Sequence, residues 1–440
     1  MIILPISEDV NRILGSFCIF LGEVIPVPLE TLILHSDLNC YYASVEMNEH
    51  PELRGKKIAV CGSTENRHGI VLTASYPAKR SGVKTGMANW QARQACPDLI
   101  MVEPHYDLYL HYSRIVRAIY RRYAEDIEPF GMDESWLSVP CCGSVERDGR
   151  KIAEEIRKTV REETGLTVSV GVSFSKIFAK LGSDMKKPDA VTVVSRGNYR
   201  DTAWNLPVSD LLYVGPATTR KLLKYSIRTI GDLARTDPAF LLARLGKNGL
   251  MLWRFANGEG GAKVMPQEYV APVKSIGHGT TCVHDLESDY EVWQVLYELA
   301  QDVGHRLRKH GITAKAVQLS VRDRDLGWYQ YQMPLACPSR SPYEISLAAW
   351  ALFRDRYRWP KPVRALTVRG INPVLENAPL QTDLFCDFVQ REKRRKVDDA
   401  VDDLRARFGT HIICPASLQG HLPLAQDRCE TVPMPNPMYQ

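Results

Sequence analysis

The sequence lacks any pair of cysteines in the C-x-x-C spacing, although it holds 11 cysteines in 440 residues. An odd, scattered set of this kind is typical of reduced thiols and speaks against a disulfide framework. It also speaks against a structural zinc site, which needs closely spaced thiolate or imidazole ligands. We therefore expect a cytoplasmic protein with free thiols.

Long hydrophobic runs are also missing, and no apolar stretch approaches the roughly 20 residues that cross a membrane. The apolar stretch SFCIFLGEVIPVPL near the start is preceded by Glu8 and Asp9 and interrupted by Glu23. Because a lone Arg12 does not make the basic leader of a signal peptide, we interpret residues 1–30 as an N-terminal extension.

The chain has no strong net charge: 56 Lys and Arg stand against 51 Asp and Glu, which gives +5. This excess alone does not single out a nucleic-acid partner. Residues 270–372, however, hold 14 Lys and Arg against 10 Asp and Glu, and so carry +4 of it. A basic module in a chain long enough for several domains suits a phosphate-rich polymer.

What the chain does have is acids at unusual places. Asp37 ends the apolar run TLILHSD, which predicts a buried strand, and Asp133 and Glu134 are adjacent in FGMDESWLS, which predicts two strands around a turn at Gly131. Carboxylates there are costly to desolvate unless a cation lies among them. Three such acids could hold two Mg²⁺ ions for phosphoryl transfer. The alternative is a helix cap at Asp37 and a solvated turn at the acidic pair.

Several further motifs favour the metal site. HSDLNCYYASVE, TASYPAKRSGVKTG, EPFGMDESWLS, VGVSFSKIFAKLGSDMKKP and LYVGPATTRKLL follow one another in an order that resembles the Y-family DNA polymerases over residues 31–385, most closely the bacterial polymerase IV type. The resemblance implies an α+β multidomain fold, a right-hand polymerase with palm, fingers, helical thumb and α/β little finger. The implied domains are palm 31–45 and 104–195, fingers 46–103, thumb with a helix-hairpin-helix 196–258, linker 259–271, little finger 272–372 and tail with a clamp-binding peptide 373–440.

The implied activity is template-directed DNA synthesis of low fidelity, used for translesion synthesis, by two-metal nucleotidyl transfer without proofreading. The resemblance assigns Asp37, Asp133 and Glu134 as catalytic metal ligands, together with the backbone carbonyl of Leu38. The cofactor would be two Mg²⁺ ions, with Mn²⁺ able to substitute. The family often has a second Asp two residues after the first, where this chain has Asn39.

The resemblance also assigns the contacts of the incoming nucleotide. The implied steric gate against a 2′-hydroxyl is Tyr42, although a core aromatic is the plain alternative. Lys79 stands where the family usually has Arg, and a lysine keeps the charge but loses the bidentate fork. The full nucleotide set is Tyr41, Tyr42, Thr73, Tyr76, Lys79 and Lys187.

Two apolar residues fall where the fingers cover the templating base, Ile70 and Leu72. Relatives that admit bulky adducts tend to have small residues there. Because Leu72 is large, we expect poorer bypass of large minor-groove adducts than of abasic sites or undamaged template.

Two segments resemble DNA-binding modules of the family. The first is a helix-hairpin-helix with Gly215 and Lys221, in which Tyr213 stands where a second glycine is usual. The second is the little finger, which begins with KSIGHGTT and offers Lys315 and Arg322. Contacts to phosphate would make binding weaken steeply with salt. An ordinary helical hairpin and a solvated basic face are the respective alternatives.

The pentapeptide QTDLF resembles the peptide by which bacterial polymerases bind the sliding clamp. Gln381 would enter a polar pocket, and Leu384 and Phe385 would fill an apolar groove. The expected partners are therefore primer-template DNA, a dNTP and a sliding clamp. We expect the protein to act as a monomer and to have no membrane partner.

Two other classes of function would explain part of the sequence. A catalytically weak or inactive scaffold derived from such a polymerase would keep the DNA-binding and clamp-binding parts and lose acids, but all three acids are present. A DNA repair glycosylase or lyase shares the helix-hairpin-helix alone and leaves the other motifs unexplained.

Overall fold

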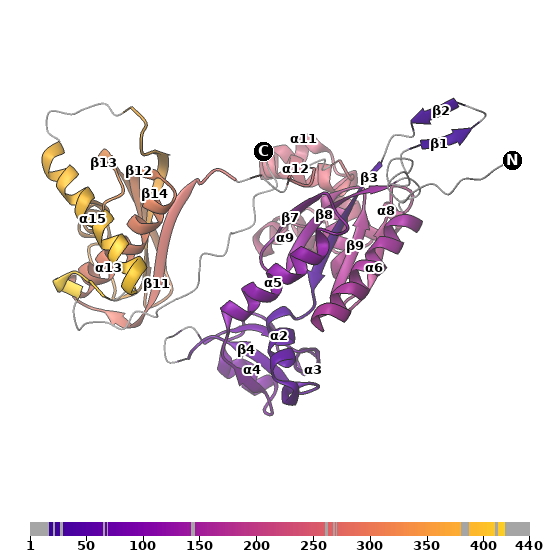
Figure 1. The fold of residues 1–440 in the computed structure, drawn as a ribbon, viewed down its shortest axis with the longest axis horizontal. Helices are drawn as coiled ribbons and strands as arrows, with labels where there is room; N and C mark the ends of the chain where they lie inside the picture. Colours follow the sequence, from indigo (N-terminus) through magenta and orange to yellow (C-terminus); the bar gives the residue numbers. More distant parts are fainter. Residues whose placement is uncertain are drawn as a thin grey trace, which may run out of the picture. The chain divides into compact units, whose positions relative to one another are not determined.

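Figure 1 shows the computed structural model of the chain. Contacts divide the chain into two compact units, and the second begins at Ala271 and takes in the loop Gly62–Ile70. In the part of the chain that is described, no helix is long and apolar enough to cross a bilayer. The described residues are 17–20, 23–26, 30–64, 67, 69–141, 146–259, 263–266, 269, 271–379, 387–409 and 412–418.

A five-stranded sheet lies at the centre of the first unit, in the order β10-β9-β3-β8-β7. The strand predicted from TLILHSD is its middle strand, β3, which pairs antiparallel with β8 and β9. Leu32 and Leu34 of β3 are fully buried, as the apolar run requires. The strands are β3 Glu30–Leu38, β7 Asp126–Pro129, β8 Glu134–Cys141, β9 Val168–Ser173 and β10 Val191–Val194.

Helix α7 (Lys176–Met185) packs directly on this sheet, and a glycine makes the close approach possible. A Cβ added to Gly171 of β9 would lie 1.9 Å from the carbonyl oxygen of Ala179. The Ser175 side chain caps the helix start by accepting a hydrogen bond from the amide of Phe178 at 3.2 Å. The other helices near the sheet are α2 Tyr41–Glu49, α5 Tyr106–Tyr120 and α6 Arg147–Thr164.

The segment predicted as fingers contains a small sheet in the order β5-β4-β6. The stretches KKIAVCG and GIVLTASY form the strand pair β4 and β5, which is antiparallel. A short helix, α4, ends before Cys96 and Pro97. The elements are η1 Pro51–Leu53, β4 Ile58–Cys61, β5 Val71–Ala74, α3 Tyr76–Arg80, α4 Asn89–Ala95 and β6 Ile100–Val102.

The segment predicted as thumb is helical, and its hairpin glycine lies before a helix rather than between α9 and α10. Gly215 precedes α9 and follows a 3-10 turn, whereas the connection from α9 to α10 contains no glycine. Tyr213 has φ 70°, the left-handed backbone that favours glycine, so the hairpin keeps its bend without the usual residue. The elements are α8 Tyr199–Ala203, η2 Val208–Asp210, α9 Pro216–Leu223, α10 Ile230–Arg235, α11 Pro238–Leu245 and α12 Lys247–Ala256.

The predicted linker is tied to the first unit near its middle. Val264 is buried in the same apolar cluster as the thumb helices. The amide of Met265 donates to the carboxylate of Glu128 at 2.8 Å, and Glu128 is also paired with the buried ammonium of Lys176 at 2.6 Å. The Gly- and Pro-rich composition predicted irregular structure but not this attachment.

The second unit contains a four-stranded sheet in the order β11-β14-β12-β13. Apolar and polar residues alternate in AKAVQLSVRDRD, and Val317, Leu319 and Val321 are fully buried in one apolar cluster with helix α13. The elements are β11 Ser275–Leu286, α13 Asp289–Lys309, β12 Ile312–Asp323, β13 Trp328–Ser339, α14 Pro342–Leu352, η3 Phe353–Tyr357 and β14 Val363–Leu375.

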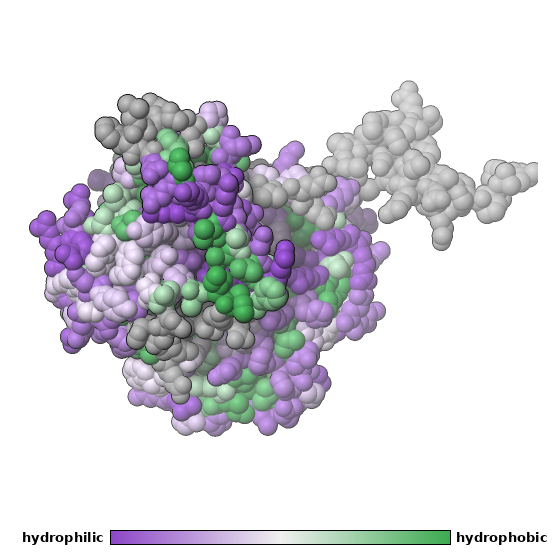
Figure 2. Space-filling view, turned by 60° about the vertical axis from the view of Figure 1, so that its left-hand side comes forward, coloured by the Kyte–Doolittle hydropathy of each residue, from purple (hydrophilic) through white to green (hydrophobic). Residues whose placement is uncertain are grey.

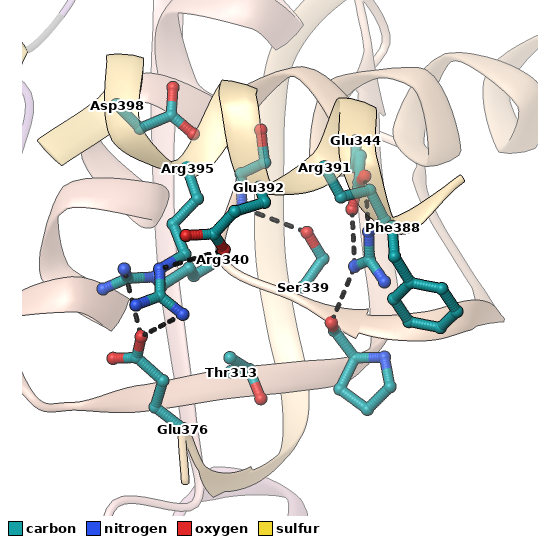
Figure 3. Close-up of a pocket in the computed structure, with 12 residues that line it drawn as sticks. Thr313, Ser339, Arg340, Glu344, Glu376, Phe388, Arg391, Glu392, Arg395 and Asp398 are labelled. Atoms are coloured by element: carbon teal, nitrogen blue, oxygen red, sulfur yellow. Dashed lines mark hydrogen bonds and ion pairs between the residues drawn. The ribbon is translucent and has the colours of Figure 1, made fainter. Parts of the chain in front are cut away.

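A tail helix, α15 (Phe388–Phe408), packs on the second unit by its charged side. Figure 3 shows Arg391 against Glu344, an ion pair at 2.9 Å, and Arg340 and Arg395 around Glu376. The sequence spacing of its apolar residues would suggest a buried side, but Val397, Leu404 and Phe408 are exposed. Figure 2 likewise shows hydrophobic patches among a mostly hydrophilic surface. The remaining elements are β1 Phe17–Phe20, β2 Glu23–Pro26 and η4 Ala416–Leu418.

Candidate functional site

The three predicted acids meet at one end of the central sheet. Asp37 of β3 stands directly opposite Glu134 of β8 in the antiparallel register. The amide of Leu38 donates to the carbonyl oxygen of Asp133 at 2.9 Å, so the backbone joins the two strands beside the acids. Side chains nearly a hundred positions apart in sequence therefore share one site.

Two lysines from the α7 segment neutralise part of this charge. Lys180 lies 3.3 Å from Asp37, 2.8 Å from Glu134 and 3.2 Å from Asp184. Lys187 lies 2.7 Å from Asp37 and 2.9 Å from Asp184. Asp37, Lys180, Asp184 and Lys187 thus form a closed ring of ion pairs, with Glu134 attached to it.

Lys187 was predicted at the nucleotide, but Lys180 and Asp184 were not predicted as part of the site. The motif SKIFAKLGSDM contains both residues. Their spacing of four places them on one side of a helix, where such a pair is common on any solvated surface. Only the packing of α7 on the sheet reveals that this side faces the acids.

A buried histidine lies behind Glu134. The His35 ring is fully buried, with Nε2 3.2 Å from a carboxylate oxygen of Glu134 and Nδ1 2.8 Å from the hydroxyl of Ser183. The ring meets Trp136 edge to face at 5.1 Å between centroids. Burial lowers the pKa of His35 below its ordinary value, which favours the neutral ring.

The three acids differ sharply in their pKa. Burial, with the charges of Glu134 and Asp37, raises the pKa of Asp133 to about 7. Burial and Glu134 also raise the pKa of Asp37. For Glu134 burial acts in the same direction, but the contacts with His35 and Lys180 outweigh it and lower the pKa to about 2. Of the three acids, Asp133 is therefore the one at which nearby cations compensate least for the negative charges of its neighbours.

The donor set fits divalent cations, although the side chains do not stand as a metal cage. In the described ranges no group of three or more His, Cys, Asp or Glu side chains is arranged to hold a metal ion. None of the ion pairs found among those residues reaches Asp133, which is half-buried. Clustered carboxylate oxygens with a surplus of negative charge are what Mg²⁺ and Mn²⁺ prefer.

The predicted steric gate is held in a cluster of tyrosines beside the acids. The Tyr42 ring stacks on Tyr109 with centroids 4.3 Å apart and planes 10° apart, and it meets Tyr106 edge to face. The Tyr41 hydroxyl donates to the Tyr109 carbonyl. These contacts hold the Tyr42 ring in place. A side chain that excludes a sugar substituent must be held in this way.

Asn39, which stands where the family often has an acid, connects several elements. Its side-chain oxygen accepts from the Ser169 hydroxyl at 2.9 Å and from the Tyr76 hydroxyl at 3.3 Å. Its side-chain nitrogen donates to Thr167 at 3.2 Å. An aspartate could accept from both hydroxyls but could not donate to Thr167 in the same way.

The other predicted nucleotide residues lie on the fingers segment. Thr73 is on β5, and Tyr76 begins α3. Lys79 is exposed one turn later, 5.2 Å above the Tyr76 ring. Of the two predicted roof residues, Leu72 is half-buried and Ile70 is 45% exposed.

The sheet of the second unit has an open face suited to phosphate. In three cross-strand rows of this face Arg322 stands beside Trp328, Ser320 beside Gln330, and Gln318 between Gln332 and Arg369, and these three rows contain no acid. Lys315 is exposed near the β12 bulge. Contacts of this polar and basic kind position a nucleic-acid backbone without reading its sequence.

The predicted helix-hairpin-helix glycine stands at the start of α9. Gly215 is exposed, a Cβ added there would meet nothing within 4 Å, and no side chain caps the helix. Lys221 is exposed on the same helix. The predicted clamp residues Gln381, Leu384 and Phe385 lie outside the described residues.

Comparisons with known proteins agree over most of the chain. Residues 36–184 match the impB/mucB/samB family, and residues 273–384 match the impB/mucB/samB family C-terminal domain. The chain is 45% identical to the DNA polymerase IV of Acetivibrio thermocellus, over 88% of this chain and 96% of that protein. It is 36% identical to the DNA polymerase IV of Bacillus velezensis, over 87% of this chain and 92% of that protein.

The fold has a solved counterpart. The structure of the "Y-family DNA polymerase chimera Dbh-Dpo4(243-245)-Dbh" matches with a TM-score of 0.67 at 23% identity, covering 78% of this chain and 99% of that one. The predicted α+β multidomain fold with a separate C-terminal sheet is thereby confirmed. The individual domain boundaries remain predictions.

Proposed function

The chain belongs to the Y-family (impB/mucB/samB) DNA polymerases of the DNA polymerase IV type, and from this premise we propose that Asp37, Asp133 and Glu134 form its catalytic centre. It is thus a DNA-directed DNA polymerase of the translesion class. The observation that supports the proposed centre best is the register of β3 and β8, which sets Asp37 opposite Glu134.

When bound, two divalent ions would supply activation of the primer 3′-hydroxyl and stabilisation of the leaving pyrophosphate. Asp37, Asp133 and Glu134 would hold them, with the Leu38 carbonyl as a further ligand, and Mn²⁺ would substitute for Mg²⁺. Tyr41 and Tyr42 would support the sugar. Thr73, Tyr76, Lys79 and Lys187 would bind the triphosphate, because hydroxyls and ammonium groups complement its charge.

Primer extension tests this centre. Replacing Asp133 with Asn removes one carboxylate at nearly constant volume and should lower kcat at least a thousandfold, with primer-template affinity changed less than threefold. The control is Lys186→Met, which changes an exposed residue of the motif VGVSFSKIFAKLGSDMKKP. This variant should extend primers normally. Undiminished synthesis by Asp133→Asn would contradict the proposed centre.

We further propose that primer-template DNA binds along the open sheet face and at the α9 hairpin. The residues expected there are Lys315, Arg322, Gly215 and Lys221. Arg322 is half-buried and the other three are exposed, which is compatible with this role. The polymerase would act as a monomer in the cytoplasm. Cysteines without a disulfide in the described chain, such as Cys40, Cys61 and Cys96, suit a reducing compartment.

We propose a sliding clamp as the protein partner, bound by the peptide QTDLF. Replacing Leu384 and Phe385 with Ala should abolish capture of this polymerase by the clamp and leave synthesis on a short template intact. Loss of both activities would indicate a structural role for these residues instead.

We also propose limited access at the templating base because Leu72 is bulky and partly packed against the central core. Bypass of large minor-groove adducts should be at least tenfold less efficient than bypass of an abasic site. Primer extension on matched templates checks this, and equal efficiency would contradict it.

A further inference from the structure

Lys180 is the cation that joins the catalytic acids, and its backbone is held firmly in place. It follows Ala179, whose carbonyl packs so closely on β9 that only glycine fits at position 171. Its side chain is 13% exposed, and its ammonium contacts acids from two strands and its own helix. The lysine therefore reaches the acid site from a fixed helix on a flexible stem.

All three ion-pair partners of Lys180 are acids of this site. Asp37 and Glu134 face each other across paired strands, so their carboxylates repel unless a cation lies between them. A divalent ion held by the same two carboxylates would repel the ammonium in turn. Asp184, which is 45% exposed and already pairs with Lys180, offers the lysine a partner away from the strands.

We propose that Lys180 is a positioning residue that holds Asp37 and Glu134 together in the metal-free enzyme and withdraws from them when a divalent ion binds. This inference rests on the proposed metal-binding role of the acids. Lys180 competes with the metal, so its charge lowers metal affinity while it keeps the empty acid cluster folded. Lys187 differs because it contacts Asp37 and Asp184 but not Glu134.

Direct metal binding tests the proposal. Mn²⁺ is titrated into the full chain without DNA or nucleotide, and free Mn²⁺ is measured by electron paramagnetic resonance. Lys180→Met should bind Mn²⁺ at least tenfold more tightly than the wild type and melt at a lower temperature without metal. Lys180→Arg, which keeps the charge, should stay within threefold of the wild type, as should the exposed Lys186→Met.

A second measurement uses the unaltered protein, in case Lys180→Met does not fold. Acetylation by a lysine reagent is followed by mass spectrometry with and without Mn²⁺. Lys180 should be protected in the metal-free protein and become at least threefold more reactive with Mn²⁺, while Lys186 stays unchanged.

The outcomes separate this inference from the proposed function. If the wild type binds Mn²⁺ but Lys180→Met binds it no more tightly, or if Mn²⁺ leaves Lys180 protected, the role given to Lys180 is wrong and the metal site stands. If no variant binds Mn²⁺ even when primer-template and nucleotide are added, the proposed metal site fails and the inference fails with it.

Discussion

At the scale of single residues, Asp133 is an acid of the proposed catalytic centre with a strongly raised pKa. Its pKa of about 7 exceeds the ordinary value of 3.8, so the folded metal-free protein binds a proton there that the unfolded chain has released. Stability from this group is full below about pH 4 and is lost as the pH rises through 7. The pKa of Glu134 is instead lowered to about 2. Its contribution to stability is therefore present above about pH 4.5 and is lost as the pH falls toward 2.

Thermal unfolding in EDTA between pH 4 and pH 8 should therefore show a decline in the wild type that is reduced in Asp133→Asn. The decline should be on the order of 3 kcal/mol in the free energy of unfolding, and Asp37 accounts for the slope that remains in the variant. Parallel curves for the two proteins would show that Asp133 titrates normally.

Tyr42 allows a second prediction at this scale. Tyr42→Ala removes the ring that stacks on Tyr109 and should raise ribonucleotide incorporation relative to deoxyribonucleotide at least tenfold, because space opens below the sugar. Single-nucleotide insertion kinetics measure the ratio. Tyr112→Phe, which removes a partly exposed hydroxyl farther along α5, serves as the control and should leave the ratio unchanged.

The pattern of apolar runs with terminal carboxylates left two interpretations open for the acids, a metal site or a helix cap with a solvated turn. The resemblance to the Y-family polymerases assigned Asp37, Asp133 and Glu134 to a metal site. Lys180 could not be identified in this way. A lysine four residues before an aspartate looks like any solvated helix pair, and its contacts depend on the strand register and on the approach of α7 over Gly171. Local sequence periodicity predicts neither the strand register nor the approach of α7 to the sheet.

At the scale of elements, local sequence pattern and structure agree in β12, where apolar and polar residues alternate, and in α13, where the buried residues recur at helical spacing. The tail helix α15 shows the limit of such reasoning. Its apolar stripe indicated a buried side, yet ion pairs of Arg391 with Glu344 and of Arg308 with Asp402 hold its charged side to the second unit. Which side of a helix packs is decided by the charges opposite it, and sequence spacing does not contain them.

The β11 glycines provide an element-scale prediction. A Cβ at Gly279 would lie 2.1 Å from the Thr367 hydroxyl oxygen on the open face of the sheet. Gly279→Ala should therefore lower the free energy of unfolding by about 1–3 kcal/mol. Adding Thr367→Gly should recover part of the loss, because it removes the clashing side chain. Urea unfolding measures both variants, and an equal loss in the double variant would contradict the clash.

At the scale of the whole molecule, the chain combines the acidic site proposed as its catalytic centre with a second unit that carries an excess of Lys and Arg. DNA binding through phosphate contacts releases counterions, so affinity should fall linearly with salt on logarithmic axes. Arg322→Ala and Arg369→Ala should each reduce that slope by about 1, whereas Arg407→Ala on exposed α15 should not. Fluorescence anisotropy at several salt concentrations measures the slopes, and unchanged slopes would place the DNA elsewhere.

The most direct measurement of the central claim is anomalous X-ray diffraction from a crystal of the polymerase with primer-template DNA, a non-hydrolysable nucleotide and Mn²⁺. Two anomalous peaks should lie within about 2.3 Å of carboxylate oxygens of Asp37, Asp133 and Glu134. No peak among these acids, with Lys180 still bridging Asp37 and Glu134, would contradict the account.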